Sequence, residues 1–269
     1  MAMTTAADTR DREAPVLRSD AEGVATLTLN RPGAYNALSL DLMRSLRAAL
    51  EAIAAEPQTR AVVIQGAGKG FCAGHDLKEL RANPGRAFYE ETFAECSRLM
   101  LAVVRLPVPV IAKVHGIATA AGCQLVASCD LAVAADDARF ATPGVNIGLF
   151  CSTPMVALSR NVPRKQAMEM LLLGEMQPAR RALEIGLINK AVPEAELEDA
   201  VAEITRTLLA KSPLTLKIGK EAFYRQAEMD LEAAYAYTAE VMTENMLTRD
   251  AGEGIDAFIE KRHPTWSGE

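Results

Sequence analysis

The chain has 269 residues, a length that fits one large domain or one domain with a smaller appendage. Its 49% hydrophobic and 24% charged content is ordinary for a globular protein with a sizeable core. The net charge of −6 gives the protein as a whole no electrostatic case for nucleic acid, although a local basic patch is still allowed. The apolar runs are far below membrane-spanning length, so we expect neither a nucleic-acid nor a membrane partner.

The cysteines and histidines exclude several kinds of site. The five cysteines stand at 72, 96, 123, 129 and 151 without a C-x-x-C pair, and their odd number argues against a disulfide framework. We expect buried, reduced thiols. The histidines at 75, 115 and 263 are too scattered to suggest a metal site. The first 15 residues hold no apolar run for a signal peptide and are too acidic for a transit peptide, which favours a cytoplasmic location.

The first half of the chain alternates strand and helix patterns after a flexible polar tail expected at residues 1–14. Residues 24–29 alternate β-branched and apolar types and end at a turn signal, so a strand is predicted there. Ser39 is expected to cap a helix that closes at Pro57. Buried strands are further predicted at 61–65, 109–114 and 131–135, with a helix at 121–128.

From about residue 152 the patterns become helical. Helices are expected between Pro178 and Gly186 and at 211–229, 231–248 and 252–262. Strands interleaved with helices and followed by a helical tail predict an α/β fold. We therefore place an α/β core at residues 15–200 and a C-terminal helical region at residues 201–269.

Several familiar sequence motifs are incomplete or absent in this chain. The glycines of residues 66–70 suggest a nucleotide loop, but Phe71 stands where G-x-G-x-x-G needs its third glycine. Gly68-Lys69 also lacks the Ser or Thr of a P-loop. Neither G-x-S-x-G nor H-E-x-x-H occurs in the chain, which argues against a serine hydrolase and a zincin.

Two loops of small residues, 70–77 and 115–124, each follow a buried strand, and the second opens a helix. Small residues let a ligand approach main-chain N–H groups closely, and a helix N-terminus adds unpaired donors. Two such loops facing each other can form an oxyanion hole. Close packing also explains small residues, so the loops alone leave both interpretations open.

Several motifs carry a family resemblance. They are N-R-P-x-x-x-N-A-L (30–38), F-C-A-G-x-D-L (71–77), A-x-x-x-G-x-A-x-A-A-G-C (112–123), C-D-L-A-V-A (129–134), F-A-T-P (140–143), A-L-E-I-G-L-I (182–188) and A-F-I-E-K-R (257–262). In this order, from about residue 22 to the C-terminus, the chain resembles the crotonase, or enoyl-CoA hydratase/isomerase, superfamily. Residues 118–134 and 140–154 resemble one subgroup of it most closely.

The resemblance implies a ClpP/crotonase-like spiral of ββα units with a C-terminal helical region used for trimerisation. It implies a homotrimer or a hexamer built from two trimers. An acyl-coenzyme A thioester is the implied substrate or ligand, with no permanently bound cofactor. By position, the N–H groups of His75 and Ala121 would form an oxyanion hole for a thioester enolate. The coenzyme A channel would be lined by Ala34, Tyr35, Ala73, Asp76, Leu77, Phe258 and Lys261.

The chain departs from this family at the two glutamates with which its hydratases place and activate water. Gln124 and Gly144 stand at those positions. Glutamine cannot exchange a proton near neutral pH and glycine has no side chain, so straightforward hydration is doubtful. Gln124→Glu combined with Gly144→Glu is expected to confer hydration if the rest of the pocket is intact.

Other side chains near these positions have two interpretations. Ser152 falls where some relatives place a catalytic aspartate, but it more simply caps a helix, and Cys151 beside it is an alternative nucleophile. Asn146 could orient water or substrate. The sequence therefore leaves open whether any of them takes part in chemistry.

The loop residues also carry alternatives. The His75 imidazole could transfer protons, Asp76 is expected to shape its loop through main-chain hydrogen bonds, and His115 is expected to pack in the core. The function predicted is an acyl-CoA enzyme, a lyase or isomerase, whose enolate chemistry differs from hydration. A non-catalytic acyl-CoA-binding or regulatory homologue and a subunit of a hetero-assembly are the alternatives.

Overall fold

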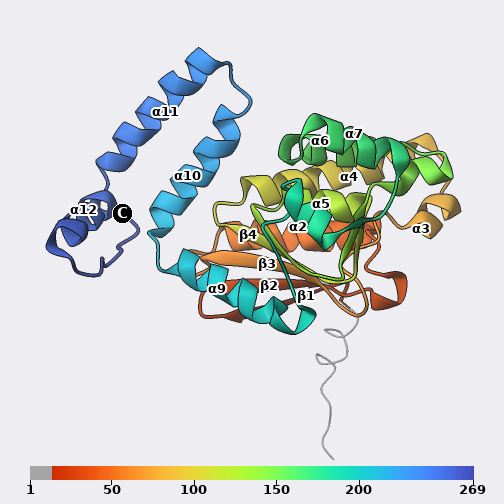
Figure 1. Cartoon of the computed structure of the whole chain (residues 1–269), viewed down its shortest axis with the longest axis horizontal. Coiled ribbons are helices and arrows are strands. Elements are labelled where there is room, and N and C mark those ends of the chain that lie inside the picture. Colours follow the sequence, from red (N-terminus) through yellow and green to blue (C-terminus); the bar gives the residue numbers. More distant parts are fainter. Residues whose placement is uncertain (1–13) are drawn as a thin grey trace, which may run out of the picture.

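The main element of the fold is a six-stranded sheet in the order β1-β2-β3-β4-β6-β9 (Figure 1). The structure is a computed structural model that describes residues 14–269, so nearly all of the tail expected at residues 1–14 lies outside the described part. The first strand pairs antiparallel with the second, and all other neighbours in this sheet are parallel. The strands are β1 (Val16–Ala21), β2 (Val24–Leu29), β3 (Ala61–Gly66), β4 (Val110–Val114), β6 (Leu131–Ala135) and β9 (Lys190–Val192).

A second sheet has three short strands in the order β5-β7-β8. They are β5 (Ile117–Thr119), β7 (Arg139–Ala141) and β8 (Gln177–Pro178). Since β5 follows β4 after only two residues, the second sheet begins at the carboxyl end of the main sheet. Of the nine strands in residues 14–269, the sequence patterns predicted β2, β3, β4 and β6, each of which has five or six residues and buried side chains. The equally long but largely exposed β1 was not predicted.

Alternation along β3 buries side chains on both faces of the main sheet. Val62 and Ile64 belong to the larger hydrophobic core, and Ala61 and Val63 to a smaller one on the opposite face. The helices α2 (Leu40–Ala54), α4 (Arg86–Arg105) and α5 (Ala121–Ser128) contribute to the larger core, and α9 (Leu197–Leu209) to the smaller. The predicted α/β class is therefore confirmed.

The helix α2 begins as predicted, because the Ser39 hydroxyl accepts the Leu42 N–H at 3.3 Å. The long helix α4 beside it was not predicted. Its buried residues follow helical spacing: Thr92, Glu95, Cys96, Leu99, Met100 and Val103. The shorter helices of the core are α3 (Leu77–Ala82), α6 (Ser152–Asn161), α7 (Arg164–Leu173) and α8 (Ala179–Glu184), and the 3-10 turns are η1 (Pro32–Ala34), η2 (Pro143–Ile147) and η3 (Glu194–Glu196).

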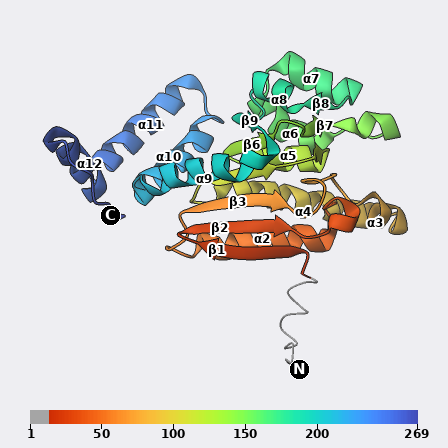
Figure 2. The same ribbon diagram turned by 60° about the horizontal axis from the view of Figure 1, so that its bottom comes forward.

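The last three helices form an arm that extends away from the sheets (Figures 1 and 2). This C-terminal arm consists of α10 (Pro213–Gln226), α11 (Leu231–Met246) and α12 (Arg249–Glu260). Each was predicted, with ends that differ by up to three residues. The helix α9 crosses the division proposed at residue 200 and packs on the main sheet, so the arm begins after it.

Candidate functional site

The two small-residue loops lie side by side and are joined by hydrogen bonds. The Cys72 N–H donates to the Ile117 carbonyl at 3.0 Å, and the Thr119 N–H donates to the Cys72 carbonyl at 2.9 Å. The Thr119 hydroxyl adds a bond to the Ala73 carbonyl at 3.0 Å. The loop that follows β3 is therefore held against β5, the strand that leads into α5.

Gly74 and Ala120 make a close contact between the loops. Gly74 has a φ of 95°, and a Cβ built on it would lie 2.8 Å from the Ala120 Cβ and 3.3 Å from the Ala121 nitrogen. Both the φ and the contact therefore require glycine. Ala120 adopts φ 49° and ψ −118°, a sparsely populated conformation that costs a residue with a Cβ roughly 1–3 kcal/mol. The Ala141 carbonyl holds this turn by accepting the Ala120 N–H at 2.8 Å.

The N–H groups of His75 and Ala121 are free on either side of this contact. The Leu38 N–H donates to the Gly74 carbonyl at 2.7 Å and the Asp76 N–H donates to the Leu38 carbonyl at 3.2 Å, so the intervening His75 N–H faces away from Leu38. Ala121 is the first residue of α5 and its N–H precedes the helical bonds. Neither N–H has an acceptor within residues 14–269.

Asp76 shapes its loop, as predicted. Its carboxylate accepts the Lys78 and Glu79 N–H groups at 3.1 and 3.2 Å and thereby caps α3. Arg31 lies 2.8 Å away and fixes the other oxygen. Burial opposes ionisation of Asp76, but the hydrogen bond from Arg31 and the main-chain bonds outweigh it and lower the carboxyl pKa. The side chain is therefore a charged structural element rather than a base.

Five of the residues expected to line the coenzyme A channel come together. Tyr35, at φ 49°, accepts the Ala73 N–H on its carbonyl at 2.9 Å, which joins the segment of Ala34 to the segment of Asp76 and Leu77. The side chains of Tyr35 and Leu77 remain about half exposed, at 47% and 48%.

The other two residues of that set, Phe258 and Lys261, lie at the end of α12 in the arm. Figures 1 and 2 place α12 and α3 at opposite ends of the molecule. Within one chain the structure therefore does not bring Phe258 and Lys261 to the loops.

Gln124 and Gly144 occupy buried positions without a carboxylate. The Gln124 Oε1 lies 3.7 Å from the Cys96 Sγ of α4, and its Nε2 donates to no acceptor within residues 14–269. A Cβ built on Gly144 would lie 2.5 Å from the Leu149 carbonyl oxygen and 3.0 Å from the Cys151 Sγ. A glutamate at residue 144 would therefore require the main chain to move, which opposes the expected restoration of hydration by substitution.

His75 places its ring against α4. The ring meets Phe93 edge to face, with 5.4 Å between centroids. Burial lowers the pKa of His75 to about 4, so the imidazole is neutral at pH 7. Its Nε2 is buried, and within residues 14–269 it has no hydrogen-bond partner.

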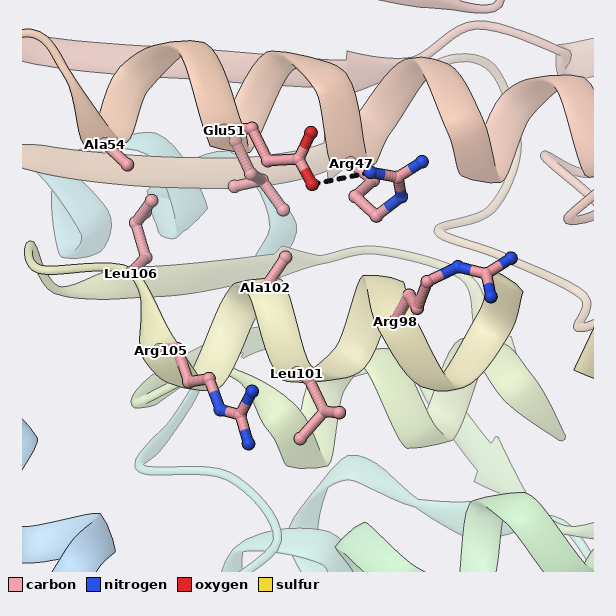
Figure 3. Close-up of a pocket in the computed structure, with 9 residues that line it drawn as sticks. Arg47, Glu51, Ala54, Arg98, Leu101, Ala102, Arg105 and Leu106 are labelled. Atoms are coloured by element: carbon pink, nitrogen blue, oxygen red, sulfur yellow. Dashed lines mark hydrogen bonds and ion pairs between the residues drawn. The ribbon is translucent and has the colours of Figure 1, made fainter. Parts of the chain in front are cut away.

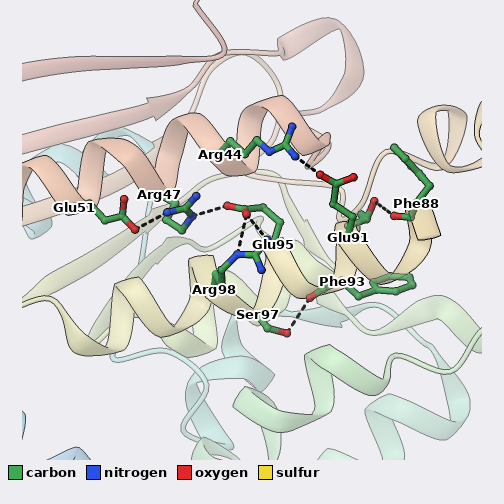
Figure 4. A network of polar contacts seen from close by, with 10 residues as sticks. Arg44, Arg47, Glu51, Phe88, Glu91, Phe93, Glu95, Ser97 and Arg98 are labelled. Atoms are coloured by element: carbon green, nitrogen blue, oxygen red, sulfur yellow. Dashed lines mark hydrogen bonds and ion pairs between the residues drawn. The ribbon is translucent and has the colours of Figure 1, made fainter. Parts of the chain in front are cut away.

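A network of ion pairs fixes α4 against α2 (Figure 4). The buried Glu95 carboxylate lies 2.6 Å from Arg47 of α2 and 2.8 Å from Arg98, and Arg44 pairs with Glu91 farther along. Burial opposes ionisation of Glu95, but the two arginines outweigh it and lower its pKa. This network sets the position of the helix whose residues contact His75 and Gln124.

A groove of about 320 Å³ lies between the same two helices, next to the ion pairs (Figure 3). None of the residues predicted for the site lines it. Its walls are Arg47, Leu50, Glu51, Ala54, Arg98, Leu101, Ala102, Arg105 and Leu106.

Two predictions for single side chains are wrong. Ser152 does not cap α6: it is the first helical residue, Cys151 precedes the helix without a side-chain cap, and the Ser152 hydroxyl donates to the Phe150 carbonyl at 3.3 Å. His115 is only partly buried, and its Nε2 contacts the Gly68 carbonyl at 2.8 Å instead of packing in the core. In both cases a main-chain carbonyl close in space supplied a partner that sequence spacing does not reveal.

Asn146 and the cysteines make contacts that stabilise the fold. The Asn146 amide donates to the Gly174 carbonyl at 3.3 Å, which ties η2 to the end of α7. All five cysteines are free and buried, as predicted. Burial raises the pKa of Cys72, Cys96 and Cys123 to about 12 and also raises that of Cys151, which argues against thiolate nucleophiles.

Within residues 14–269, no group of three or more His, Cys, Asp or Glu side chains could hold a metal ion. In the same part of the chain, no helix has the length and apolar character needed to cross a membrane.

Residues 19–269 match the enoyl-CoA hydratase/isomerase family, and the chain belongs to it. The crystal structure titled enoyl-CoA hydratase from Mycobacterium smegmatis is 54% identical and superimposes with a TM-score of 0.92, covering 94% of this chain and 98% of that one. The predicted crotonase fold with its C-terminal helical region is therefore confirmed.

The chain is also similar to enoyl-CoA hydratase domain-containing protein 3, mitochondrial, from Homo sapiens. The two are 48% identical over 255 residues, 95% of this chain and 84% of the relative. The crystal structure of that human protein superimposes with a TM-score of 0.91 at 47% identity, covering 94% of this chain and 100% of that one. This similarity over almost the whole chain confirms the predicted resemblance to one subgroup of the family.

A more distant relative is the short-chain-enoyl-CoA hydratase of Clostridium acetobutylicum, 36% identical over 246 residues, 89% of this chain and 92% of the relative. The expectation of a cytoplasmic location was wrong, because the similar proteins from Rattus norvegicus, Homo sapiens and Mus musculus are named mitochondrial.

Proposed function

We propose that this chain binds an acyl-coenzyme A thioester and holds its carbonyl oxygen with the N–H groups of His75 and Ala121. The observation that carries the proposal is that both donors are unpaired and lie on either side of the contact between Gly74 and Ala120. Donors fixed in this way stabilise the charge of a thioester enolate, and one such donor is typically worth about 10²–10³ in rate.

The chemistry that follows differs from hydration. Gln124 cannot serve as an acid or base, and the crowding at Gly144 excludes a second carboxylate. An enolate formed here would have to lose or gain its proton through another group or through the substrate itself. The absence of carboxylates at residues 124 and 144 also favours the alternative of a non-catalytic acyl-CoA-binding protein. Such a protein would need only the hydrogen bonds to the thioester carbonyl.

A homotrimer, or a hexamer of two trimers, is the proposed assembly. Phe258 is 85% exposed and belongs to α12, which lies at the opposite end of the molecule from α3, so a channel lined by Phe258 and the loops requires the arm of another copy. The arm also exposes large apolar side chains that such packing would cover: Phe223, Leu231, Tyr235, Met242, Leu247 and Ile259. Native mass spectrometry of the pure chain tests this, and a monomer would contradict it.

The grip on the carbonyl is tested by comparing butyryl-CoA with its thioether analogue S-butyl-CoA, which lacks the oxygen. Calorimetry should show about tenfold tighter binding of the thioester. An amide-to-ester replacement at Ala121, made with the α-hydroxy analogue of alanine, removes this N–H and keeps the side chain, and it should abolish most of that difference. The same replacement at Leu231, the first residue of α11, is the matched control. Equal affinity for both compounds in the native protein would contradict the proposal.

Turnover separates the enzyme from the binding protein. Mass spectrometry of the native protein with enoyl-, 3-oxoacyl- and saturated acyl-CoA esters should reveal a changed product for at least one of them. Binding without any product would favour the non-catalytic alternative.

A further inference from the structure

Residues 31–38 run along the loop that carries His75 and are bonded to it at several points. The Tyr35 carbonyl accepts the Ala73 N–H at 2.9 Å, and Leu38 forms a parallel bridge with His75. The middle and the end of the loop are therefore fixed by main-chain contacts with this segment.

Asn36 fixes the start of the same loop with its side chain. Its amide NH₂ donates to the carbonyls of Gly70 at 2.8 Å and Ala67 at 2.9 Å, and its Oδ1 accepts the Arg31 N–H at 2.9 Å. Both amide hydrogens and the oxygen are therefore used. The residue is fully buried and adopts a left-handed φ of 55°, which asparagine tolerates better than most residues.

The Asn36 amide is closely packed at the point where the loop begins. A Cβ built on Gly66 would lie 2.7 Å from the Asn36 Nδ2 and 2.6 Å from the Gly70 carbonyl oxygen. Gly70 stands two residues before Cys72, whose N–H and carbonyl bond to β5. A shift of Gly70 would therefore reach both small-residue loops, because Cys72 is where they are joined.

We propose that Asn36 is a positioning residue that sets the spacing between the N–H groups of His75 and Ala121. Because it is buried, it acts through the Gly70 carbonyl and not by contact with the ligand. The inference rests on the proposed binding of an acyl-CoA thioester. It adds the residue that keeps the two donors at the spacing that the carbonyl oxygen requires.

Asn36→Asp tests this role, because it keeps the shape of the side chain and the acceptor for the Arg31 N–H. It replaces the NH₂ by an oxygen that faces two carbonyl oxygens, so the Gly70 carbonyl should move away. Calorimetry of the folded variant should show butyryl-CoA binding only about two- to threefold more tightly than S-butyl-CoA, against about tenfold for the native protein.

Lowering the pH from about 8 to about 5.5 should restore part of this preference in Asn36→Asp. A buried carboxylate that faces carbonyl oxygens is protonated well above its ordinary pKa, and the protonated carboxyl can again donate to one of them. The native preference should stay constant, because both ligands carry the same coenzyme A and its own titration cancels in the ratio. A preference in Asn36→Asp that does not respond to pH would contradict the role of the NH₂ as donor.

Asn36→Gly provides a second test if Asn36→Asp does not fold, because glycine adopts the positive φ of this position readily. It should also lower the preference several-fold. Asn161→Asp is the matched control, because the Asn161 amide likewise donates to two main-chain carbonyls, those of Ala127 and Ala157 at 2.8 Å, at the end of α6. This control should keep the native preference.

A lower melting temperature with an unchanged preference in either variant of Asn36 would show that the amide only stabilises the fold. That result would overturn the positioning role and leave the proposed function standing. Equal binding of both ligands by the native protein would instead overturn the proposed function, and the positioning role with it.

Discussion

The Lys220 Nζ lies 2.7 Å from the Asp130 Oδ2 and joins the C-terminal arm to the core. The same ammonium donates to the carbonyls of Val103 at 3.2 Å and Val108 at 3.0 Å. Asp130 in turn accepts the Tyr224 hydroxyl at 2.8 Å. Burial lowers the pKa of Lys220 while Asp130 opposes that shift, as expected for an ion pair with 8% and 17% of its side chains exposed.

Lys220→Met should weaken the folded state by about 3–5 kcal/mol, because it leaves the Asp130 carboxylate buried without its cation. Urea unfolding followed by circular dichroism measures this difference. Lys217→Met removes an exposed lysine from the same helix and should change little. An equal effect of the two substitutions would mean that the ion pair does not hold the arm.

Gly144→Ala should destabilise the protein by about 1–3 kcal/mol, because even a methyl group would overlap the Leu149 carbonyl oxygen. Gly219→Ala is the matched control: a Cβ there meets nothing within 4 Å, and alanine should stabilise α10 by up to about 1 kcal/mol. Thermal unfolding of both variants gives opposite shifts if the crowding is real. An unchanged melting temperature of Gly144→Ala would show that the main chain around residue 149 moves at little cost.

The crowding also changes the expectation for the missing glutamates. Gln124→Glu with Gly144→Glu should give no measurable hydration of crotonyl-CoA, followed by the loss of enoyl absorbance. The carboxylate at residue 144 cannot enter the site while the Leu149 carbonyl stays in place. Hydration by this double variant would instead show that the loop rearranges and that the rest of a hydratase site is intact.

Sequence spacing predicted the parts of the fold that depend on local pattern. The buried strands and the Ser39 cap followed from apolar runs and from a hydroxyl before a helix. The same rule failed at Ser152, because the turn before α6 makes it the first helical residue instead. The helix α4 was overlooked although its buried residues have helical spacing, since Glu95 and Thr92 interrupt the apolar stripe. Only the packed fold shows that arginines compensate Glu95.

For the site, the order of the family motifs located the two small-residue loops and the glycines within them. It could not show that Gly144 is crowded, because Leu149 and Cys151 reach that position only after the chain folds back. Nor could it show that Thr142 Oγ1 and His75 Nε2 are buried without a hydrogen-bond partner within residues 14–269. These properties depend on contacts between segments that lie apart in the sequence.

The buried imidazole of His75 predicts a specific loss of stability in acid. Its pKa falls from the ordinary 6.5 to about 4 in the folded state because burial disfavours the charged form. The unfolded chain therefore binds more protons between pH 6.5 and about pH 4, so stability rises with pH across that window. The stability that depends on a neutral His75 is fully present above pH 6.5 and is lost as the pH falls toward 4.

His75→Gln should therefore lose less stability than the native protein when the pH is lowered from about 7 to about 4.5, by about 2 kcal/mol. Protonation of carboxylates with lowered pKa values, such as Glu95 and Asp76, also reduces the stability of the protein in acid. This loss is the same in both proteins and therefore cancels when they are compared. His263→Gln, which removes an exposed imidazole, is the matched control. Urea unfolding at a series of pH values gives the difference directly. Parallel curves for the native protein and His75→Gln would mean that the ring is solvated and can carry charge in the folded protein.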